Sequence, residues 1–155
     1  MVITEVTTAR KLAVVIEPLE DKDFRLITKK RHSFDWKKER GISNLFKLIV
    51  QGEADILGLL AIIDYPREFR MQIRLLSVSR ENLGKMKKYE GIAGCLIAFV
   101  GRMAVSKYFE QACISLIPKT ELRNHYKSKY GMMDGGAQLF LEGSLLQAII
   151  KKYLT

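Results

Sequence analysis

The sequence KYEGIAGCLIAF, residues 88–99, is the most informative part of the chain, because a glycine in it joins an apolar β-rich run to a long helical pattern. The first N–H groups of a helix have no partner within the helix, and the helix dipole adds about half a positive charge there. Gly91 allows the backbone to approach a ligand, while Ala93 and Gly94 keep the first turn unobstructed. Lys85, Lys87 and Lys88 add mobile positive charge. This turn therefore predicts a binding site for a diphosphate.

The same glycine has a second explanation, which is a tight turn needed only for packing. The spacing does not match GxxxxGK[ST], which cradles nucleoside triphosphates. It also does not match GxGxxG with an acidic residue about 20 positions later, because Glu110 ends a helical pattern rather than a strand. Both nucleotide-binding signatures are therefore excluded.

The run before this turn, residues 69–78, alternates like a strand with one interruption. One face holds Phe69, Met71, Ile73 and Leu75. At Leu75–Leu76 the parity changes, and Leu76 and Val78 take the other face. An extra residue in a β-bulge produces such a change. A bulge frees backbone N–H and C=O groups, so a ligand with amides of its own could pair with them.

Earlier in the chain, residues 45–50 and 56–63 are apolar runs joined by GEAD at residues 52–55, which predicts an antiparallel hairpin. Residues 11–16 and 23–27 are typical of two short strands, or of a strand and a turn. The basic connection between them and the hairpin contains two aromatic residues and could form a short helix. Those aromatic residues are Phe34 and Trp36.

After the turn, residues 92–105 follow the i, i+3, i+4, i+7 spacing of an amphipathic helix. A second face of this helix carries mostly small side chains, which we expect to approach the sheet closely. These are Gly94, Ala98, Gly101 and Val105. Residues 112–117, ended by Pro118, are typical of a fully buried parallel strand.

The C-terminal part predicts one more helix, a last strand and a terminal helix. Thr120 is a candidate cap for a helix at residues 121–130, which Gly131 would end. A strand at residues 139–141 and a helix at residues 145–153 follow. The expected fold class is α/β (α+β): one domain, residues 1–155, with a central mixed, mostly antiparallel sheet of six to seven strands and helices on both faces.

Composition places the chain among ordinary globular proteins, with 48% apolar and 28% charged residues. Lysine and arginine number 26 against 17 acidic residues, and the net charge of +9 favours a polyanionic partner. Cys95 and Cys113 sit in apolar runs without metal-ligand spacing, so we expect small core residues. The N-terminus lacks a signal-peptide pattern, and the apolar run at residues 92–105 is shorter than a membrane span. Cytoplasmic localisation is expected.

The stretch KYEGIAGCLIAF resembles the cofactor signature [QR]-x-x-G-x-[GA] of the GNAT superfamily of acyl-CoA-dependent N-acyltransferases. Lys88 takes the Gln/Arg place, Gly91 the glycine place and Ala93 that of the last small residue. The resemblance extends over residues 45–141 and includes the order of elements and the bulged strand. This chain departs from the family pattern in a longer loop at residues 79–90, and in Lys119 and Met132 where Asn and Phe are common.

This resemblance implies acetyl-CoA as the cosubstrate, with coenzyme A as product. Strand backbone would pair with the pantetheine arm, and amides of the turn would hold the pyrophosphate. The implied cofactor-binding residues are Leu76, Val78, Lys88, Tyr89, Gly91, Ile92, Ala93 and Gly94. Tyr126 is the implied catalytic acid, which donates a proton to the departing thiolate, and Tyr130 is its rival. A phenol with a pKa of about 10 stays protonated at neutral pH and suits that role.

The implied activity is acetyl transfer from acetyl-CoA to a primary amine by direct attack in a ternary complex. No general base is assigned; water, backbone carbonyls, Glu142 and His125 are the alternatives. His125 and His32 are otherwise expected to be surface or packing residues. Residues 29–40 occupy the part of the chain that usually shapes the acceptor site in this family.

The acceptor is expected to be a small-molecule or macromolecular amine, with a nucleic-acid-linked amine among the alternatives because residues 29–40 are basic. No membrane partner is expected, and a homodimer is an open alternative. Two other functions compete with the enzyme. One is a basic nucleic-acid-binding module, and the other is a relative that binds acyl-CoA without catalysis.

Overall fold

The computed structural model describes residues 1–154, which form one nine-stranded sheet in the order β6-β1-β2-β3-β4-β5-β7-β9-β8. Its strands are β1 (Val2–Glu5), β2 (Lys11–Pro18), β3 (Asn44–Val50), β4 (Ile56–Tyr65), β5 (Arg70–Val78), β6 (Tyr89–Glu90), β7 (Cys113–Leu116), β8 (Met133–Gly135) and β9 (Gln138–Glu142). The α-helices are α1 (Ile92–Tyr108), α2 (Arg123–Tyr130) and α3 (Gly143–Leu154). Within this sheet β5 and β7 are parallel, and the other neighbours are antiparallel. The mixed, mostly antiparallel class is confirmed.

Nine strands exceed the six to seven expected from the sequence. The strands that were missed, β1, β6 and β8, have only two to four residues each, too few for an alternation to stand out. They lie toward the edges of the sheet, where β1 bridges β2 and β6. The predicted hairpin β3–β4, the parallel strand β7 and the crossover helix α1 are all present.

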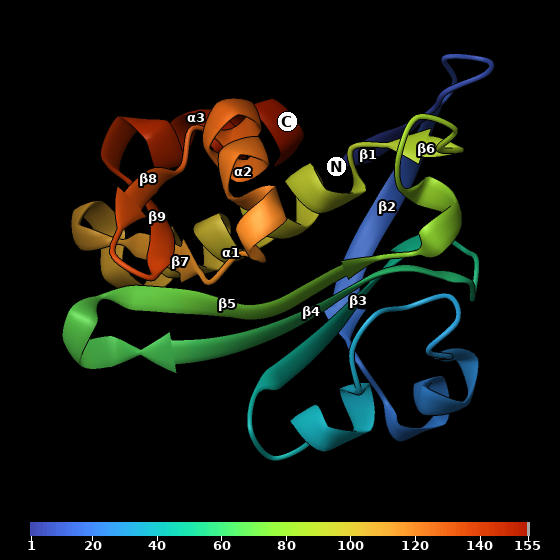
Figure 1. Ribbon diagram of the computed structural model, residues 1–155, viewed down its shortest axis with the longest axis horizontal. Coiled ribbons are helices and arrows are strands. Elements are labelled where there is room, and N and C mark those ends of the chain that lie inside the picture. The colour runs from blue at the N-terminus through green and yellow to red at the C-terminus, as the bar shows by residue number, and fades with distance from the viewer. Residues whose placement is uncertain (155) are drawn as a thin grey trace.

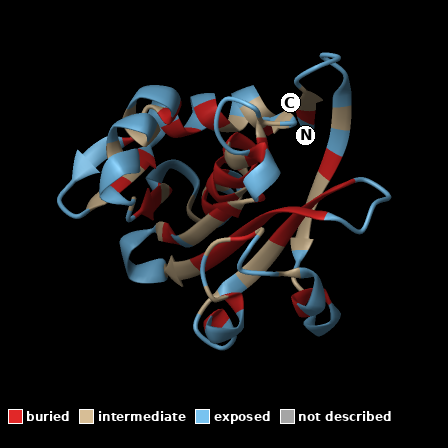
Figure 2. Ribbon diagram, turned by 45° about the vertical axis from the view of Figure 1, so that its right-hand side comes forward, coloured by how far each residue is buried: buried red, intermediate tan, exposed pale blue. Residues whose placement is uncertain are grey.

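The two faces of the sheet are covered differently. Figure 1 shows α1, α2 and α3 gathered on one side of β5, with the short helical segments between β2 and β3 on the other side. Those segments are 3-10 helices, at Asp21–Leu26 and Trp36–Glu39. Buried residues follow β4, β5 and α1 through the middle of the molecule (Figure 2). The larger core lies under the α-helices, and a smaller one around Phe24 and Trp36 lies under the 3-10 segments.

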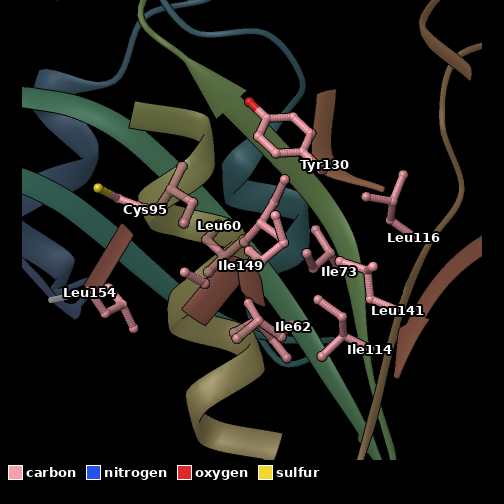
Figure 3. Close-up of a cluster of buried hydrophobic side chains, with 14 of the residues drawn as sticks. Leu60, Ile62, Ile73, Cys95, Ile114, Leu116, Tyr130, Leu141, Ile149 and Leu154 are labelled. Atoms are coloured by element: carbon pink, nitrogen blue, oxygen red, sulfur yellow. The ribbon is translucent and has the colours of Figure 1, made fainter. Parts of the chain in front are cut away.

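The sheet approaches α1 closely at a glycine of β4. A Cβ on Gly58 would lie 2.9 Å from Ile92 and 3.0 Å from Leu96, so a larger residue there would push the helix away. Figure 3 shows the core that results, with Leu60 and Ile62 of β4 among side chains from α1 and α3.

The small-residue face of α1 packs on α3, so the prediction that it approaches the sheet is wrong. A Cβ on Gly94 would lie 2.2 Å from the Tyr153 ring, and one on Gly101 would lie 2.9 Å from Leu146. Helical spacing identifies which residues share a face, but it does not say which neighbour covers that face.

Of the two alternatives for residues 11–16 and 23–27, the structure has a strand followed by a turn, because the Asp23 carboxylate accepts the Glu20 N–H at 2.8 Å and closes the capping box of the 3-10 segment Asp21–Leu26. One local prediction is corrected. Thr120 does not cap an α-helix: a 3-10 turn, Thr120–Leu122, comes first, and α2 begins at Arg123. Gly131 ends α2 in a left-handed conformation, as predicted.

The stretch Ile92–Gln111, which contains α1, is long and apolar enough to cross a membrane, with a mean hydropathy of 1.4. Half of its most apolar window is nevertheless buried inside the protein, against β4, β5, β7 and α3. The buried core helix of a soluble protein can be equally long and apolar, so length and hydropathy alone are weak evidence for a membrane span.

Candidate functional site

The bulge in β5 lies at Arg74. Ala61 of β4 pairs with Leu75, but the next residue, Ile62, pairs with Ile73, so Arg74 has no partner on β4. Leu75 then packs with the smaller core, while Leu76 returns to the larger one. The predicted bulge is confirmed, and the change of parity falls one residue earlier than the sequence suggested.

Beyond the bulge, one edge of β5 has no neighbouring strand. The parallel pairing with β7 ends where Ile73 meets Leu116, while β5 continues to Val78. On the other edge, the Ser79 N–H donates to the Leu57 carbonyl at 2.9 Å, so residues 75, 77 and 79 turn their backbone groups toward β4. The alternation of an antiparallel ladder directs the backbone groups of Leu76 and Val78 toward the open edge.

Two connected hollows follow this open edge. The first, of 360 Å³, extends from Arg74 to Tyr130, and the second, of 290 Å³, reaches the turn at Gly91. They share six lining residues: Val78, Leu83, Ala93, Leu122, His125 and Tyr130. Together they form one groove, called the cleft below, which joins the bulged strand to the start of α1.

The start of α1 presents unpaired backbone groups to the cleft. Gly91 has φ +99°, a left-handed conformation that residues with a Cβ rarely adopt, and it precedes the helix as its cap. The Cys95 N–H donates the first hydrogen bond of the helix, to the Gly91 carbonyl at 2.9 Å. The N–H groups of residues 92–94 therefore have no acceptor within the helix. Gly91, Ile92 and Ala93 line the cleft. The turn is thus open to a ligand.

Three of the predicted cofactor residues have other roles in the structure. The Tyr89 N–H donates to Asn82 Oδ1 at 2.8 Å, and the Lys88 N–H donates to the Glu81 carbonyl at 3.2 Å. Lys88 is exposed and does not line the cleft, whereas Lys87 and Tyr89 do. Gly94 is buried against α3 rather than against the cleft. The turn therefore offers free N–H groups at residues 92–94.

Asn82 is a site residue that sequence reasoning missed. It is 5% exposed, and its Nδ2 donates to Ser79 Oγ at 2.8 Å while its Oδ1 accepts the Tyr89 N–H. These bonds brace the loop between β5 and β6, which forms one wall of the cleft. A single asparagine in a basic loop carries no pattern by which it could have been found.

Tyr126 and Tyr130 of α2 both line the cleft, with ring centroids 5.9 Å apart. Burial raises the pKa of Tyr126, and burial together with Tyr153 and Tyr126 raises the pKa of Tyr130 further. Tyr130 is 3% exposed, and Figure 3 shows its hydroxyl pointing away from the apolar side chains of the core. Both phenols are protonated at neutral pH and can donate a proton.

His125 lies beside both tyrosines, 5.8 and 6.0 Å from their ring centroids. Burial and the charges of Lys129 and Lys87 lower its pKa, so the imidazole is neutral at pH 7. Glu142 pairs with Cys113 at the end of β7 remote from the cleft, which removes it as a base. Among the described residues, no carboxylate lines the larger hollow.

The segment predicted to shape the acceptor site reaches the cleft through Ser33 and Phe34. Trp36 is 2% exposed and His32 is completely buried, so both belong to the buried side of this segment. Burial and Arg31 lower the pKa of His32, which is therefore a neutral packing residue. Cys95 is also buried, and desolvation raises its pKa to about 11.

A scan of the sequence against protein-family models finds no match, and a search of curated protein sequences finds none either. Solved structures do resemble this fold. A candidate streptothricin acetyltransferase from Bacillus anthracis, in complex with acetyl coenzyme A, superposes with a TM-score of 0.63 at 11% identity, over 86% of this chain and 100% of that one.

Two further structures resemble the chain to a similar degree. The ribosomal-protein-S18-alanine N-acetyltransferase from Escherichia coli has a TM-score of 0.58 at 11% identity, over 85% of this chain and 97% of that one. An N-acetyltransferase from Staphylococcus aureus Mu50 has a TM-score of 0.56 at 15% identity, over 84% and 98%. Together with the bulged strand, the end of β5 that extends beyond its pairing with β7 and the glycine-opened helix, these likenesses show that the chain has the fold of the GNAT superfamily of acyltransferases.

Proposed function

We propose that this protein is an acetyl-CoA-dependent N-acetyltransferase, which transfers an acetyl group to a primary amine by direct attack in a ternary complex. The observation that carries the proposal is the cleft itself. It runs without interruption from the unpaired N–H groups at Gly91, along the open edge of β5, to the two tyrosines of α2. An elongated ligand with a phosphate end, an amide-bearing arm and a thioester end matches that sequence of groups.

The chain would hold acetyl-CoA in two ways. The N–H groups of residues 92–94 would bind the diphosphate, with the helix dipole and Lys87 adding positive charge. The outward-facing backbone groups of Leu76 and Val78 would pair with the amides of the pantetheine arm, as an added strand pairs with a sheet edge. Of the residues implied by the family resemblance, Lys88 would act through its mobile charge alone, and Tyr89 through its side chain.

Acetyl-CoA supplies an acetyl thioester, and its sulfur needs a proton when the C–S bond breaks. Tyr126 is the residue we assign to this proton transfer, since it lines the same hollow as Leu76 and Val78 and burial raises the pKa of its phenol, which is therefore protonated at neutral pH. The attacking amine must be neutral and loses one proton to water or to His125, whose imidazole is neutral at pH 7. The apolar lining of the cleft favours the neutral amine.

An assay of thiol release from acetyl-CoA against a panel of primary amines tests this activity. We expect release that depends on both the amine and the enzyme, with a mass gain of one acetyl group on the amine. Binding of acetyl-CoA without thiol release on any amine would favour a relative that binds the cosubstrate without catalysis. Absence of binding would contradict the proposal as a whole.

A further inference from the structure

A third hollow, of 280 Å³, opens beside the acceptor end of the cleft, and Phe34 lines both. Its lining residues come from the 3-10 segments and the connection between them: Phe24, Ile27, Lys29, Phe34, Asp35, Trp36 and Lys37. Nothing in the proposed binding of acetyl-CoA uses these residues. Their combination of aromatic rings, lysines and one carboxylate calls for an explanation of its own.

Phe34 is held in an unfavourable conformation. Its φ of +77° lies in the left-handed region, which large side chains avoid, and its side chain is 38% exposed. The buried Trp36 fixes it there: the indole Nε1 donates to the Ser33 carbonyl at 2.6 Å, and the two rings meet edge to face at 6.4 Å. Strain of this kind gathers at ligand sites, where the surrounding structure maintains it. The fold thus presents an aromatic ring to solvent at the mouth of the cleft.

Lysines lie around this ring and in the segment that carries it. Lys29 and Lys37 line the hollow, Lys119 lies over the ring, and Lys30 and Lys38 are the sequence neighbours of the first two. The Lys119 Nζ lies 5.2 Å from the Phe34 ring centroid, and the other four are not in an ion pair with any residue of the part of the chain that the structure describes. The arginines of the segment differ, because Arg31 is paired with Asp55 and Glu81, and Arg40 with Asp21. The free charge is therefore carried by flexible lysines, which suit phosphates.

We propose that this hollow binds one base of a single-stranded nucleic acid, which stacks on Phe34 while its phosphates lie along the lysines. This inference rests on the proposed function in one respect: the nucleic acid would carry the acceptor amine into the cleft past Phe34. A free phosphate fits the hollow less well, because the Asp35 carboxylate would repel it. The amino group of a base can instead donate a hydrogen bond to that carboxylate. Base stacking and phosphate contact together are how single strands are bound.

Binding of a single-stranded RNA of about 12 nucleotides, a DNA of the same sequence and inorganic polyphosphate tests the site. Phe34→Leu is expected to weaken oligonucleotide binding about tenfold, since stacking is lost, and to leave polyphosphate binding unchanged. Phe34→Tyr, which keeps the ring, should bind like the wild type. Equal oligonucleotide affinity in Phe34→Leu and the wild type would overturn the stacking site, and so would equal loss of polyphosphate binding.

The lysines are tested by the salt dependence of the same binding. Lys29→Ala/Lys37→Ala should lower the slope of log affinity against log salt by about 1.4, because each phosphate contact on a single strand contributes about 0.7. The control Lys11→Ala/Lys152→Ala removes the same charge from β2 and α3 and should leave the slope unchanged. Equal slopes in both double variants would overturn the assignment of the phosphates.

A final arm separates this inference from the proposed function. The oligonucleotide that binds is synthesised with a primary amine at one end and incubated with acetyl-CoA, whose own binding is measured by calorimetry. If this amine is acetylated, and Phe34→Leu impairs the acetylation, the result supports both the base site and the proposed function. Binding of acetyl-CoA and acetylation of simple amines, without oligonucleotide binding, overturns the inference alone. Phe34-dependent oligonucleotide binding without acetyl-CoA binding supports the base site and overturns the proposed function.

Discussion

Tyr126 and Tyr130 lie one helical turn apart on α2, and their burial separates their roles. Tyr130 is almost fully buried between Tyr126 and Tyr153, whereas Tyr126 is half-buried and lines only the larger hollow. A proton donor must reach the sulfur at the acceptor end of the cleft, which favours Tyr126. Tyr130 then serves mainly as a wall of the groove.

Tyr126→Phe should lower kcat about 100-fold, a usual contribution of a general acid, while the Kd for acetyl-CoA stays within about twofold. Because burial raises the pKa of Tyr126, the phenol remains a proton donor at high pH, and its deprotonation should not limit kcat below pH 10. Steady-state kinetics and calorimetry measure both quantities. Tyr130→Phe is the matched control, and full activity in Tyr126→Phe with an inactive Tyr130→Phe would transfer the role to Tyr130.

The first 3-10 segment is fixed to the sheet by a buried ion pair. Lys47 of β3 donates to both Asp23 oxygens at 2.9 and 2.8 Å, and both side chains are less than 10% exposed. Burial alone would raise the pKa of Asp23, but the hydrogen bonds from Lys47 and from the Glu20 N–H have the larger effect, so the pKa of Asp23 is lowered. Burial alone would lower the pKa of Lys47, but Asp23 and Glu17 outweigh it, so the pKa of Lys47 is raised. This pair anchors the 3-10 segment Asp21–Leu26 to β3, directly before residues 29–40, which we propose to shape the acceptor site.

Asp23→Asn should lower the free energy of unfolding at pH 7 by about 3–5 kcal/mol, because it leaves a buried lysine without its partner. A carboxyl with a lowered pKa stabilises the fold above its unfolded pKa of about 3.9, and the contribution is lost as pH falls through the folded value. Wild-type stability should therefore drop below about pH 4 more steeply than that of the variant. Urea unfolding at several pH values measures this. The exposed Asp21→Asn is the control, and a loss as small as the control's would contradict the anchoring role.

Elements with long periodic patterns could be predicted from the sequence, and so could the turn that opens α1. The hairpin β3–β4, the bulge in β5 and Gly91 all appear as local patterns. Short strands such as β1 and β6 could not be predicted, because two to four residues carry no period. Contacts that form only in the folded chain could not be predicted either. They include the bond from the Tyr89 N–H to Asn82, the packing of α3 on Gly94, and the edge-to-face contact of Trp36 with Phe34.

Across the whole molecule, one cleft connects segments that are far apart in the sequence. Arg31, from the acceptor segment, bonds to Asp55 at 2.5 Å in the β3–β4 turn and to Glu81 at 2.9 Å in the loop beside Gly91. Arg31 lowers the pKa of Glu81, which keeps this carboxylate charged. Residues 29–40 and the loop beside Gly91 are therefore tied together. We infer that the end of this cleft at Gly91 binds the diphosphate of coenzyme A.

Isothermal titration calorimetry of acetyl-CoA into the wild type and into Gly91→Val tests this inference. We expect saturable one-to-one binding to the wild type and none to the variant, because a β-branched residue cannot hold φ +99° and the turn that presents the N–H groups would be lost. Circular dichroism melting confirms that the variant is folded, and Gly52→Val, at another left-handed glycine far from the cleft, controls for strain. Wild-type protein that takes up no acetyl-CoA, or a folded Gly91→Val that binds it with unchanged affinity, would show that this turn does not bind the diphosphate.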